Sequence, residues 1–191
     1  MSDLSVFPLL ALVIMLVMMP ACNNQQVRRA YLHQETLASV VNAVTIEGVP
    51  EAVFDLVTTA RFWPQWHPAT TAVSGVTERP YRLGDRINER GRIGNSEFNV
   101  ICKVTEHARP RTIALQSEGS PVRITYSFNP RGSGTEFIRK LEYHVEDLGA
   151  VAGDPDEVNR LMRAQSAQAV KQLKALVEKI LHAEAIRAEP K

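Results

Sequence analysis

The spacing of apolar and polar residues predicts a strand, a short helix, a series of further strands and a long final helix. Residues 39–47 (SVVNAVTIE) are rich in β-branched side chains and predict the first strand. Gly48 interrupts that pattern, and Pro50 suits the first position of a helix. Residues 51–57 have the amphipathic pattern of a short helix, whereas two prolines limit 61–68 to at most one more short helical turn.

The middle of the chain alternates between apolar and polar residues and contains frequent turn signals. Gly94–Asn95 is typical of a tight turn, and the glycines of 119–120 and 132–134 mark two further connections. Short strands joined by short loops predict an antiparallel sheet. The strands predicted in this region are 71–77, 85–93, 97–106, 111–117, 122–128 and 135–145.

A long helix is predicted at the end of the chain. Asp154 is a good N-cap, Pro155 suits the first helical position, and apolar residues recur every three or four positions as far as about His182. Within this stripe, residues 164–169 are all small or polar. These six positions have two interpretations: they leave an unfilled pocket beside the helix, or they allow the helix to approach the sheet closely.

This order of elements is the helix-grip plan, an α+β fold in which a curved antiparallel sheet of about seven strands wraps around a long C-terminal helix. The segment Glu51–Pro68, EAVFDLVTTARFWPQWHP, resembles the signature of the polyketide cyclase/dehydrase group of the START-like (SRPBCC) superfamily. The glycine-rich turn at 132–135 is also similar to a hairpin of that group. The matching residues are Pro50, Val53, Phe54, Trp63, Trp66, His67 and Pro68, with Phe54 in place of a commoner tryptophan.

The resemblance covers about 39–181 and implies a central cavity, but the superfamily has diverse functions, so the fold alone does not define this one. Composition excludes some classes. The 22 Lys and Arg nearly balance the 21 Asp and Glu, which is unlike a nucleic-acid binder. The five histidines have no metal-binding spacing, and no phosphate-binding or dinucleotide-binding glycine motif is found, so we expect no metal and no cofactor.

The N-terminal segment is apolar and predicts membrane attachment. Residues 4–19 carry no charge, and about 16 helical residues span roughly 24 Å, slightly less than a bilayer core requires. Pro20, Ala21 and Cys22 follow, and this order resembles the lipobox of bacterial lipoproteins, in which the cysteine is lipidated. The predicted organisation is a signal or anchor segment over 1–22, a tether over 23–38, the START-like domain over 39–184 and a polar tail over 185–191.

The expected location is therefore the membrane, as a lipoprotein of the cell envelope. Arg28 and Arg29 favour an alternative, because positive charge after the apolar run would keep the C-terminal domain in the cytoplasm behind an uncleaved anchor. A misassigned start of the chain is a third interpretation.

Two charged residues are expected on inward faces of the sheet. A period of two places Glu89 on the face of Ile87 and Ile93, and Arg139 on the face of Phe137. An isolated buried charge costs several kcal/mol, so the two side chains need each other, water or a polar group of a ligand. In the alternative interpretation, one or both lie at the rim of the sheet.

The candidate site residues combine these inward positions with the motif and the helix. His67, Glu89 and Tyr126 are the candidates for a general acid or base, although loop support explains His67 as well, and burial beside a backbone partner explains Tyr126. Trp66 is also interpreted as a plug at one end of the sheet, and Cys102 as a core thiol. The expected ligand-binding residues are Trp66, Glu89, Cys102, Tyr126, Arg139, Tyr143, Met162, Gln165 and Ala169.

These observations predict a membrane-tethered domain that binds or transports a hydrophobic small molecule or lipid. One alternative is a cyclase- or dehydratase-type enzyme that acts on a hydrophobic polyketide-like or aromatic substrate. Another is a stress or assembly factor that binds proteins through its outer sheet. The arginines between 79 and 92 form either a solvated strand face or a contact with anionic lipid headgroups.

Overall fold

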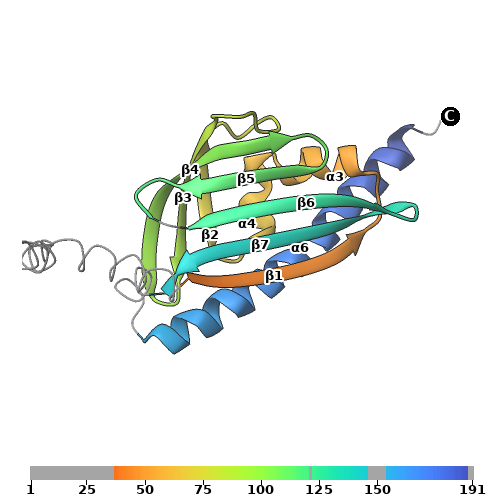
Figure 1. The fold of residues 1–191 in the computed structure, drawn as a ribbon. Coiled ribbons are helices and arrows are strands. Elements are labelled where there is room, and N and C mark those ends of the chain that lie inside the picture. Colours follow the sequence, from red (N-terminus) through yellow and green to blue (C-terminus); the bar gives the residue numbers. More distant parts are fainter. Residues whose placement is uncertain (1–36, 121, 146–153, 189–191) are drawn as a thin grey trace, which may run out of the picture. The chain divides into compact units, whose positions relative to one another are not determined.

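The computed structural model describes residues 37–120, 122–145 and 154–188, which form one curved sheet with helices on its concave side (Figure 1). The predicted leader, including Cys22, lies outside the described residues, as does all of the predicted tether except its last two residues. Among the described helices, none is long and apolar enough to span a bilayer.

The sheet contains seven strands in the order β1-β7-β6-β5-β4-β3-β2, and every neighbouring pair is antiparallel. From β2 to β7, each strand pairs with the next in the chain, whereas β1 lies beside β7. Register shifts near Thr70 in β2 and near Val104 in β4 mark bulges, which bend and twist strands. The strands are β1 (Leu37–Ile46), β2 (Thr70–Gly75), β3 (Arg86–Ile93), β4 (Ser96–Ala108), β5 (Thr112–Ser117), β6 (Arg123–Arg131) and β7 (Gly134–His144).

Short helices connect the two edge strands, β1 and β2. Helix α3 (Pro50–Val57) has Pro50 in its first turn, and the 3₁₀ turn η1 (Ala60–Phe62) leads into α4 (Trp63–Trp66). Phe54, which replaces the commoner tryptophan of the motif, is fully buried and lies 5.0 Å from the ring of Phe128. The predicted helix and the predicted extra helical turn are therefore confirmed.

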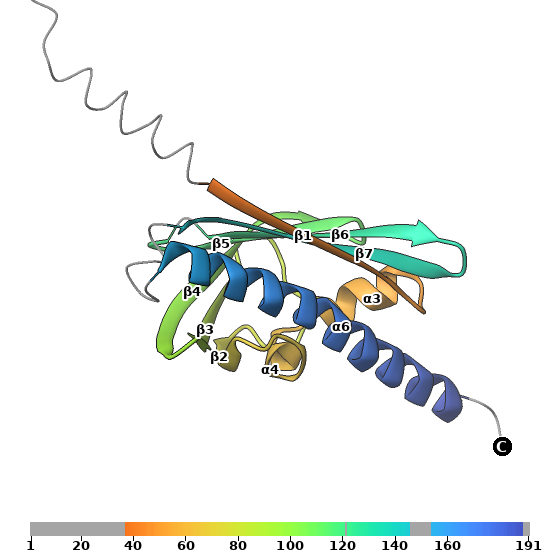
Figure 2. The same ribbon diagram turned by 90° about the horizontal axis from the view of Figure 1, so that it is seen from below.

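The long helix α6 (Pro155–Ala188) contacts β1, β7, α3 and α4. Figure 2 shows the sheet curving over α6, with α3 and α4 on the same side of the sheet. The Asp154 side chain accepts a hydrogen bond from the Asp156 N–H at 2.8 Å, which confirms the predicted N-cap. The helix continues to Ala188 beyond the expected end near His182, because residues 183–188 favour helix without needing an apolar face. The helix-grip fold predicted from the sequence is confirmed.

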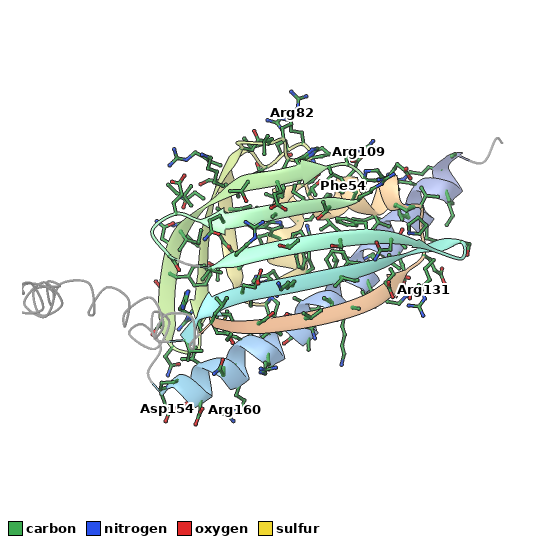
Figure 3. The ribbon with its side chains drawn as sticks, in the orientation of Figure 1. Phe54, Arg82, Arg109, Arg131, Asp154 and Arg160 are labelled. Carbon is green, nitrogen blue, oxygen red and sulfur yellow. The ribbon has the colours of Figure 1, made fainter. Side chains whose placement is uncertain are left out.

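The labelled charged residues Arg82, Arg109, Arg131, Asp154 and Arg160 lie at the periphery (Figure 3). Arg109 forms two hydrogen bonds of 2.8 Å with Asp55, joining the end of β4 to α3. Of the predicted basic cluster, Arg79 pairs with Asp85 at 2.7 Å. Other members of that cluster on β3 are exposed, as the alternating pattern predicts.

Gly91 is required by the close packing of three strands. It lies in β3 opposite Thr70 of β2 and Phe98 of β4. A Cβ atom at this position would lie 2.2 Å from the Ala69 carbonyl oxygen and 2.4 Å from Cζ of Phe98. A side chain here would therefore force backbone and ring to move apart.

We expect Gly91→Ala to lower the free energy of unfolding by about 2 kcal/mol or more, because the added methyl group overpacks this contact. Urea denaturation measures the change. Arg92→Ala is the matched control, because its side chain is exposed on the same strand, and a change within about 0.5 kcal/mol is expected. Equal stability of Gly91→Ala and the wild type would contradict the observed packing.

Candidate ligand-binding cavity

A cavity of about 390 Å³ lies between the sheet and α6. Its wall includes side chains from β3 to β7, from α6 and from the segment after α4. It lies where two core clusters meet, since Ile93, Leu141 and Met162 come from one cluster and Cys102 and Leu115 from the other. The apolar lining residues are Ala69, Ile93, Phe98, Val100, Leu115, Val122, Ile124, Leu141 and Met162.

The small and polar stretch of α6 contributes to this cavity in part. Gln165 and Ser166 line it, whereas Ala169 is fully buried in the core beside the sheet. Both sequence interpretations of 164–169 therefore apply, each to different positions. The helix leaves space at Gln165 and Ser166 and approaches the sheet closely at Ala169.

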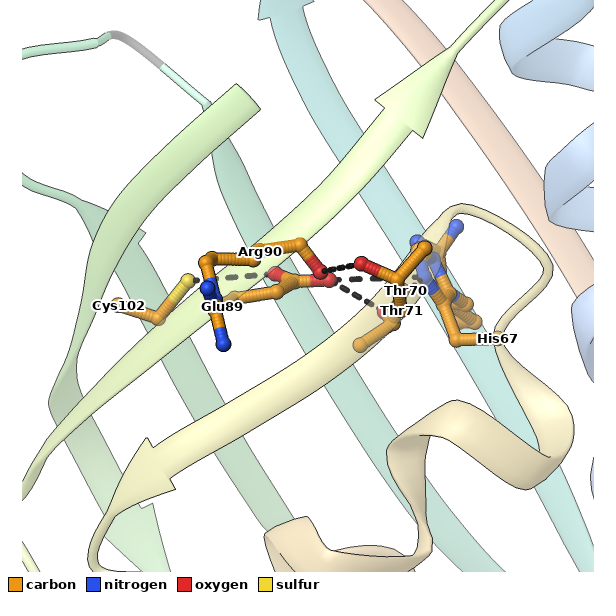
Figure 4. Close-up of polar contacts among 7 residues, drawn as sticks. His67, Thr70, Thr71, Glu89, Arg90 and Cys102 are labelled. Carbon is orange, nitrogen blue, oxygen red and sulfur yellow. Dashed lines mark hydrogen bonds and ion pairs between the residues drawn. The ribbon is translucent and has the colours of Figure 1, made fainter. Parts of the chain in front are cut away.

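A chain of hydrogen bonds lies at the polar part of the wall (Figure 4). The Thr70 hydroxyl bonds to a carboxylate oxygen of Glu89, and His67 Nδ1 lies 2.8 Å from the same hydroxyl. On the other side of the imidazole ring, Arg139 donates to His67 Nε2 at 3.0 Å and to Ser166 Oγ at 2.7 Å. Ser166 in turn donates to Asn42 Oδ1 of β1 at 2.6 Å.

The hydrogen-bond donors in this chain determine the protonation state of His67. A guanidinium group only donates, so His67 Nε2 must accept and therefore carries no proton. Nδ1 then carries the proton of the neutral ring and donates it to Thr70, whose hydroxyl proton points to Glu89. Burial, together with repulsion from Arg139, lowers the pKa of His67 to about 3, which agrees with a neutral ring.

Glu89 is the buried acid of the wall, with 6% of its surface exposed. Burial raises the pKa of its carboxyl group, while the Thr70 hydrogen bond and the charge of Arg139 oppose that shift. Cys102 Sγ lies 3.7 Å from the second carboxylate oxygen of Glu89. Burial and the nearby Glu89 raise the pKa of the Cys102 thiol, which favours the predicted core thiol over a reactive thiolate.

Arg139 is the buried cation of the wall, with 2% of its surface exposed. Arg139 is one of the residues that line the cavity, and its Nε atom has no hydrogen-bond partner among the described residues. Within that part of the chain, no carboxylate oxygen lies within 4.0 Å of it. Among the described residues, the hydrogen bonds that connect the two buried charges therefore run through the neutral Thr70 and His67 side chains.

The sequence matches the family described as "Polyketide cyclase / dehydrase and lipid transport" over residues 38–178. The chain belongs to this family. The family match covers β1 to β7 and most of α6, so it includes every residue of the hydrogen-bond chain described above. A comparison with curated proteins gives no match.

Solved structures with the same fold have low sequence identity to this protein. The NMR structure of the KanY protein is 16% identical, with a TM-score of 0.60, and the match covers 74% of this chain and 97% of KanY. TTHA0849 from Thermus thermophilus is 16% identical with a TM-score of 0.60, at 73% and 97% coverage. The Zhui aromatase/cyclase from Streptomyces sp. R1128 is 15% identical with a TM-score of 0.60, at 76% and 96% coverage. These likenesses show the shared fold.

Five of the expected ligand-binding residues line the cavity of this family member, and so does His67. These five are Glu89, Cys102, Arg139, Met162 and Gln165. The structure brings Glu89 and Arg139 to the inner face, as the period of two predicts, and not to the rim. No group of three His, Cys, Asp or Glu side chains in the described ranges is arranged to bind a metal ion.

The other four expected ligand-binding residues are buried and do not line this cavity. Trp66 packs edge-on against His67 and Tyr126, so it supports the wall from behind. Tyr126 packs 5.5 Å from the ring of Phe137, and burial raises its pKa to about 12. Tyr143 donates to Asn159 Oδ1 at 2.8 Å, and Ala169 is enclosed in the core.

Sequence reasoning missed Thr70, Ser166 and Asn42 as partners in the hydrogen-bond chain. Asn42 shares the inner face of β1 with Val40, so its orientation was available from the period of two. Ser166 lies in the small and polar stretch of α6, where residue type indicates space beside the helix but no particular partner. The pairing of Thr70 with both His67 and Glu89 had no local signal, because it joins two separate elements.

The neutral state of His67 makes stability depend on pH. The unfolded chain binds a proton at His67 below about pH 6.5, whereas the folded protein does not until about pH 3. Acidification through this window therefore destabilises the fold. The raised pKa of Glu89 acts in the opposite direction, because the folded state then holds a proton more tightly than the unfolded state.

We expect the stability advantage of the wild type over His67→Gln to fall by about 2 kcal/mol between about pH 7 and pH 5. Comparing the two proteins removes the contribution of Glu89, and glutamine can still donate to Thr70 and accept from Arg139. Urea denaturation at several pH values measures the difference. His182→Gln, at an exposed position of α6, should leave the pH dependence unchanged. Parallel curves for the wild type and His67→Gln would show that His67 is not held neutral.

Proposed function

We propose that this protein binds one apolar small molecule or lipid-like chain in the cavity between the sheet and α6. The observation that carries the proposal is the unfilled space of about 390 Å³ bounded mainly by apolar side chains. Protein interiors are normally close-packed, so such a space is unusual unless a ligand occupies it. Its volume lies at the small end of the range typical of ligand pockets, roughly 300–1,000 Å³.

The chemistry of the wall matches this proposal. An apolar guest gains free energy by leaving water for the surfaces of residues such as Phe98, Leu115 and Leu141. The few polar groups are concentrated in the Glu89–Arg139 chain, and they can orient a guest that carries a polar group. The family description names lipid transport and cyclase or dehydrase activity, and both involve hydrophobic molecules.

Binding without covalent chemistry is favoured over the enzymatic alternative by the state of the candidate groups. A general acid or base must reach the reacting atom with a free proton or lone pair. In His67 both ring nitrogens are already engaged by Thr70 and Arg139, and Tyr126 lies behind the cavity wall. A cyclase- or dehydratase-type reaction would therefore depend on Glu89 alone.

We expect Val100→Trp to abolish uptake of a neutral apolar probe, 2-naphthylmethanol, by the full chain. Val100 lines the cavity, so the indole ring would occupy the space that the probe requires. Ile101→Trp is the matched control, because Ile101 is the next residue of β4 and is 37% exposed on the outer face. Native mass spectrometry and isothermal titration calorimetry measure uptake. If the wild type takes up neither the probe nor a cellular ligand, or if both variants bind equally, the proposal fails.

Membrane tethering through the N-terminal segment is the second part of the proposal. The uncharged run 4–19, the small residue before Cys22 and the polar residues after it support lipidation of Cys22. Acyl chains contribute about 0.8 kcal/mol per buried methylene group, so two or three chains would hold the domain firmly at the bilayer. A tethered domain would then take its hydrophobic ligand from, or deliver it to, the membrane to which it is attached.

We expect the membrane fraction of cells that produce the full chain to contain an acylated fragment beginning at Cys22. Intact-mass measurement detects it, and Cys22→Ser should abolish it because no thiol remains for acylation. Cys102→Ser is the control, since the second cysteine of the chain is buried in the domain and should not affect acylation. A membrane-bound chain that retains Met1 would indicate the uncleaved anchor instead.

A further inference from the structure

The two buried charges of the cavity wall do not touch each other. Arg139 and Glu89 are both more than nine-tenths buried, yet the neutral side chains of His67 and Thr70 lie between them. A buried arginine usually pairs directly with a carboxylate, because both ions lose their hydration shell. In this protein Arg139 instead lines a largely apolar cavity, and no carboxylate of the described residues forms an ion pair with it.

The hydrogen-bond inventory of Arg139 is also incomplete. A guanidinium group has five N–H donors. One is donated to Ser166 and one to His67. The Nε–H is buried and has no acceptor in the described part of the chain. Arg139 therefore keeps unassigned N–H donors and a charge without a directly paired carboxylate, in a residue that lines the cavity.

We propose that the ligand of this cavity carries a carboxylate or similar acidic oxygen group, and that Arg139 is its anchor. The inference rests on the proposed function, because it names the chemical class of the guest. A carboxylate supplies two acceptor oxygens and the missing counter-charge at once. A neutral hydroxyl group supplies an acceptor oxygen but no counter-charge, and an ammonium group would be repelled by Arg139.

Glu89 defines the orientation of such a guest. It lines the same cavity, so its negative charge repels an acidic head group from its own end of the hydrogen-bond chain. The head group then lies beside Arg139 and Ser166, and the apolar body lies against the apolar part of the wall. Arg139 attracts the head group and Glu89 opposes it, so removing each should change affinity in opposite directions.

The test compares three probes that share one apolar body: 2-naphthoate, 2-naphthylmethanol and 2-naphthylmethylammonium. Isothermal titration calorimetry with the purified full chain near neutral pH measures each dissociation constant. We expect 2-naphthoate to bind about tenfold or more tightly than the alcohol, because a charge-assisted hydrogen bond is stronger than a neutral one. The ammonium probe, which only Glu89 could attract, should bind more weakly than 2-naphthoate, and the reverse order would overturn the inference.

Variants of the cavity wall show which side chain causes the preference for 2-naphthoate. Arg139→Gln should remove the preference for 2-naphthoate over the alcohol, and Glu89→Gln/Arg139→Gln should do the same without leaving an unpaired buried carboxylate. Glu89→Gln alone should tighten 2-naphthoate binding several-fold and leave the alcohol unchanged, because only the opposing charge is removed. Arg90→Gln is the matched control, since that exposed arginine lies next to Glu89 on the outer face of β3.

The outcomes separate this inference from the proposed function. If 2-naphthoate and 2-naphthylmethanol bind equally and Val100→Trp blocks both, the cavity binds ligands but Arg139 is not an anion anchor. Weaker 2-naphthoate binding in Glu89→Gln would also overturn the inference, because Glu89 would then assist the acid. Failure of all three probes to bind would overturn the inference, and it would overturn the proposed function as well if native mass spectrometry also detects no cellular ligand.

Discussion

The burial of Arg139 and Glu89 in a largely apolar interior is the constraint on which the rest of the site depends. Each ion loses its hydration shell, and the chain compensates with hydrogen bonds instead of direct contact. Thr70 and His67 transmit the interaction between the two ions, and Ser166 binds the far side of the guanidinium group. The neutrality of His67, its tautomer and the polarity of one part of the cavity wall all follow from this arrangement.

The same hydrogen bonds connect elements that are distant in sequence. Asn42 lies on one edge strand of the sheet, Thr70 on the other, and Ser166 on the helix between them. The motif after α3 positions two of the important rings, because Trp66 packs behind the wall while the adjacent His67 enters the hydrogen-bond chain. The segment that resembles the family signature therefore contributes one ring that supports the cavity wall and one that belongs to the hydrogen-bond chain.

Local patterns predicted the fold and the inward direction of the charged residues, but not the contacts between them. A period of two placed Glu89 and Arg139 inside, and the motif located His67. The curvature of the sheet, which no local pattern encodes, determines which inward residues reach the cavity. Tyr126 shares an inward face but is covered by neighbouring rings, and Tyr143 is held by Asn159 of α6. Side-chain contacts between the sheet and α6 form only once the two have packed together, so local sequence patterns do not predict them.

A crystal structure of the full chain with 2-naphthoate tests the central claim most directly. The account predicts that the naphthalene ring occupies the space between the sheet and α6, with the carboxylate within hydrogen-bond distance of the Arg139 guanidinium and the His67–Thr70–Glu89 chain intact. A space filled by the protein's own side chains, or a carboxylate bound away from Arg139, would contradict it.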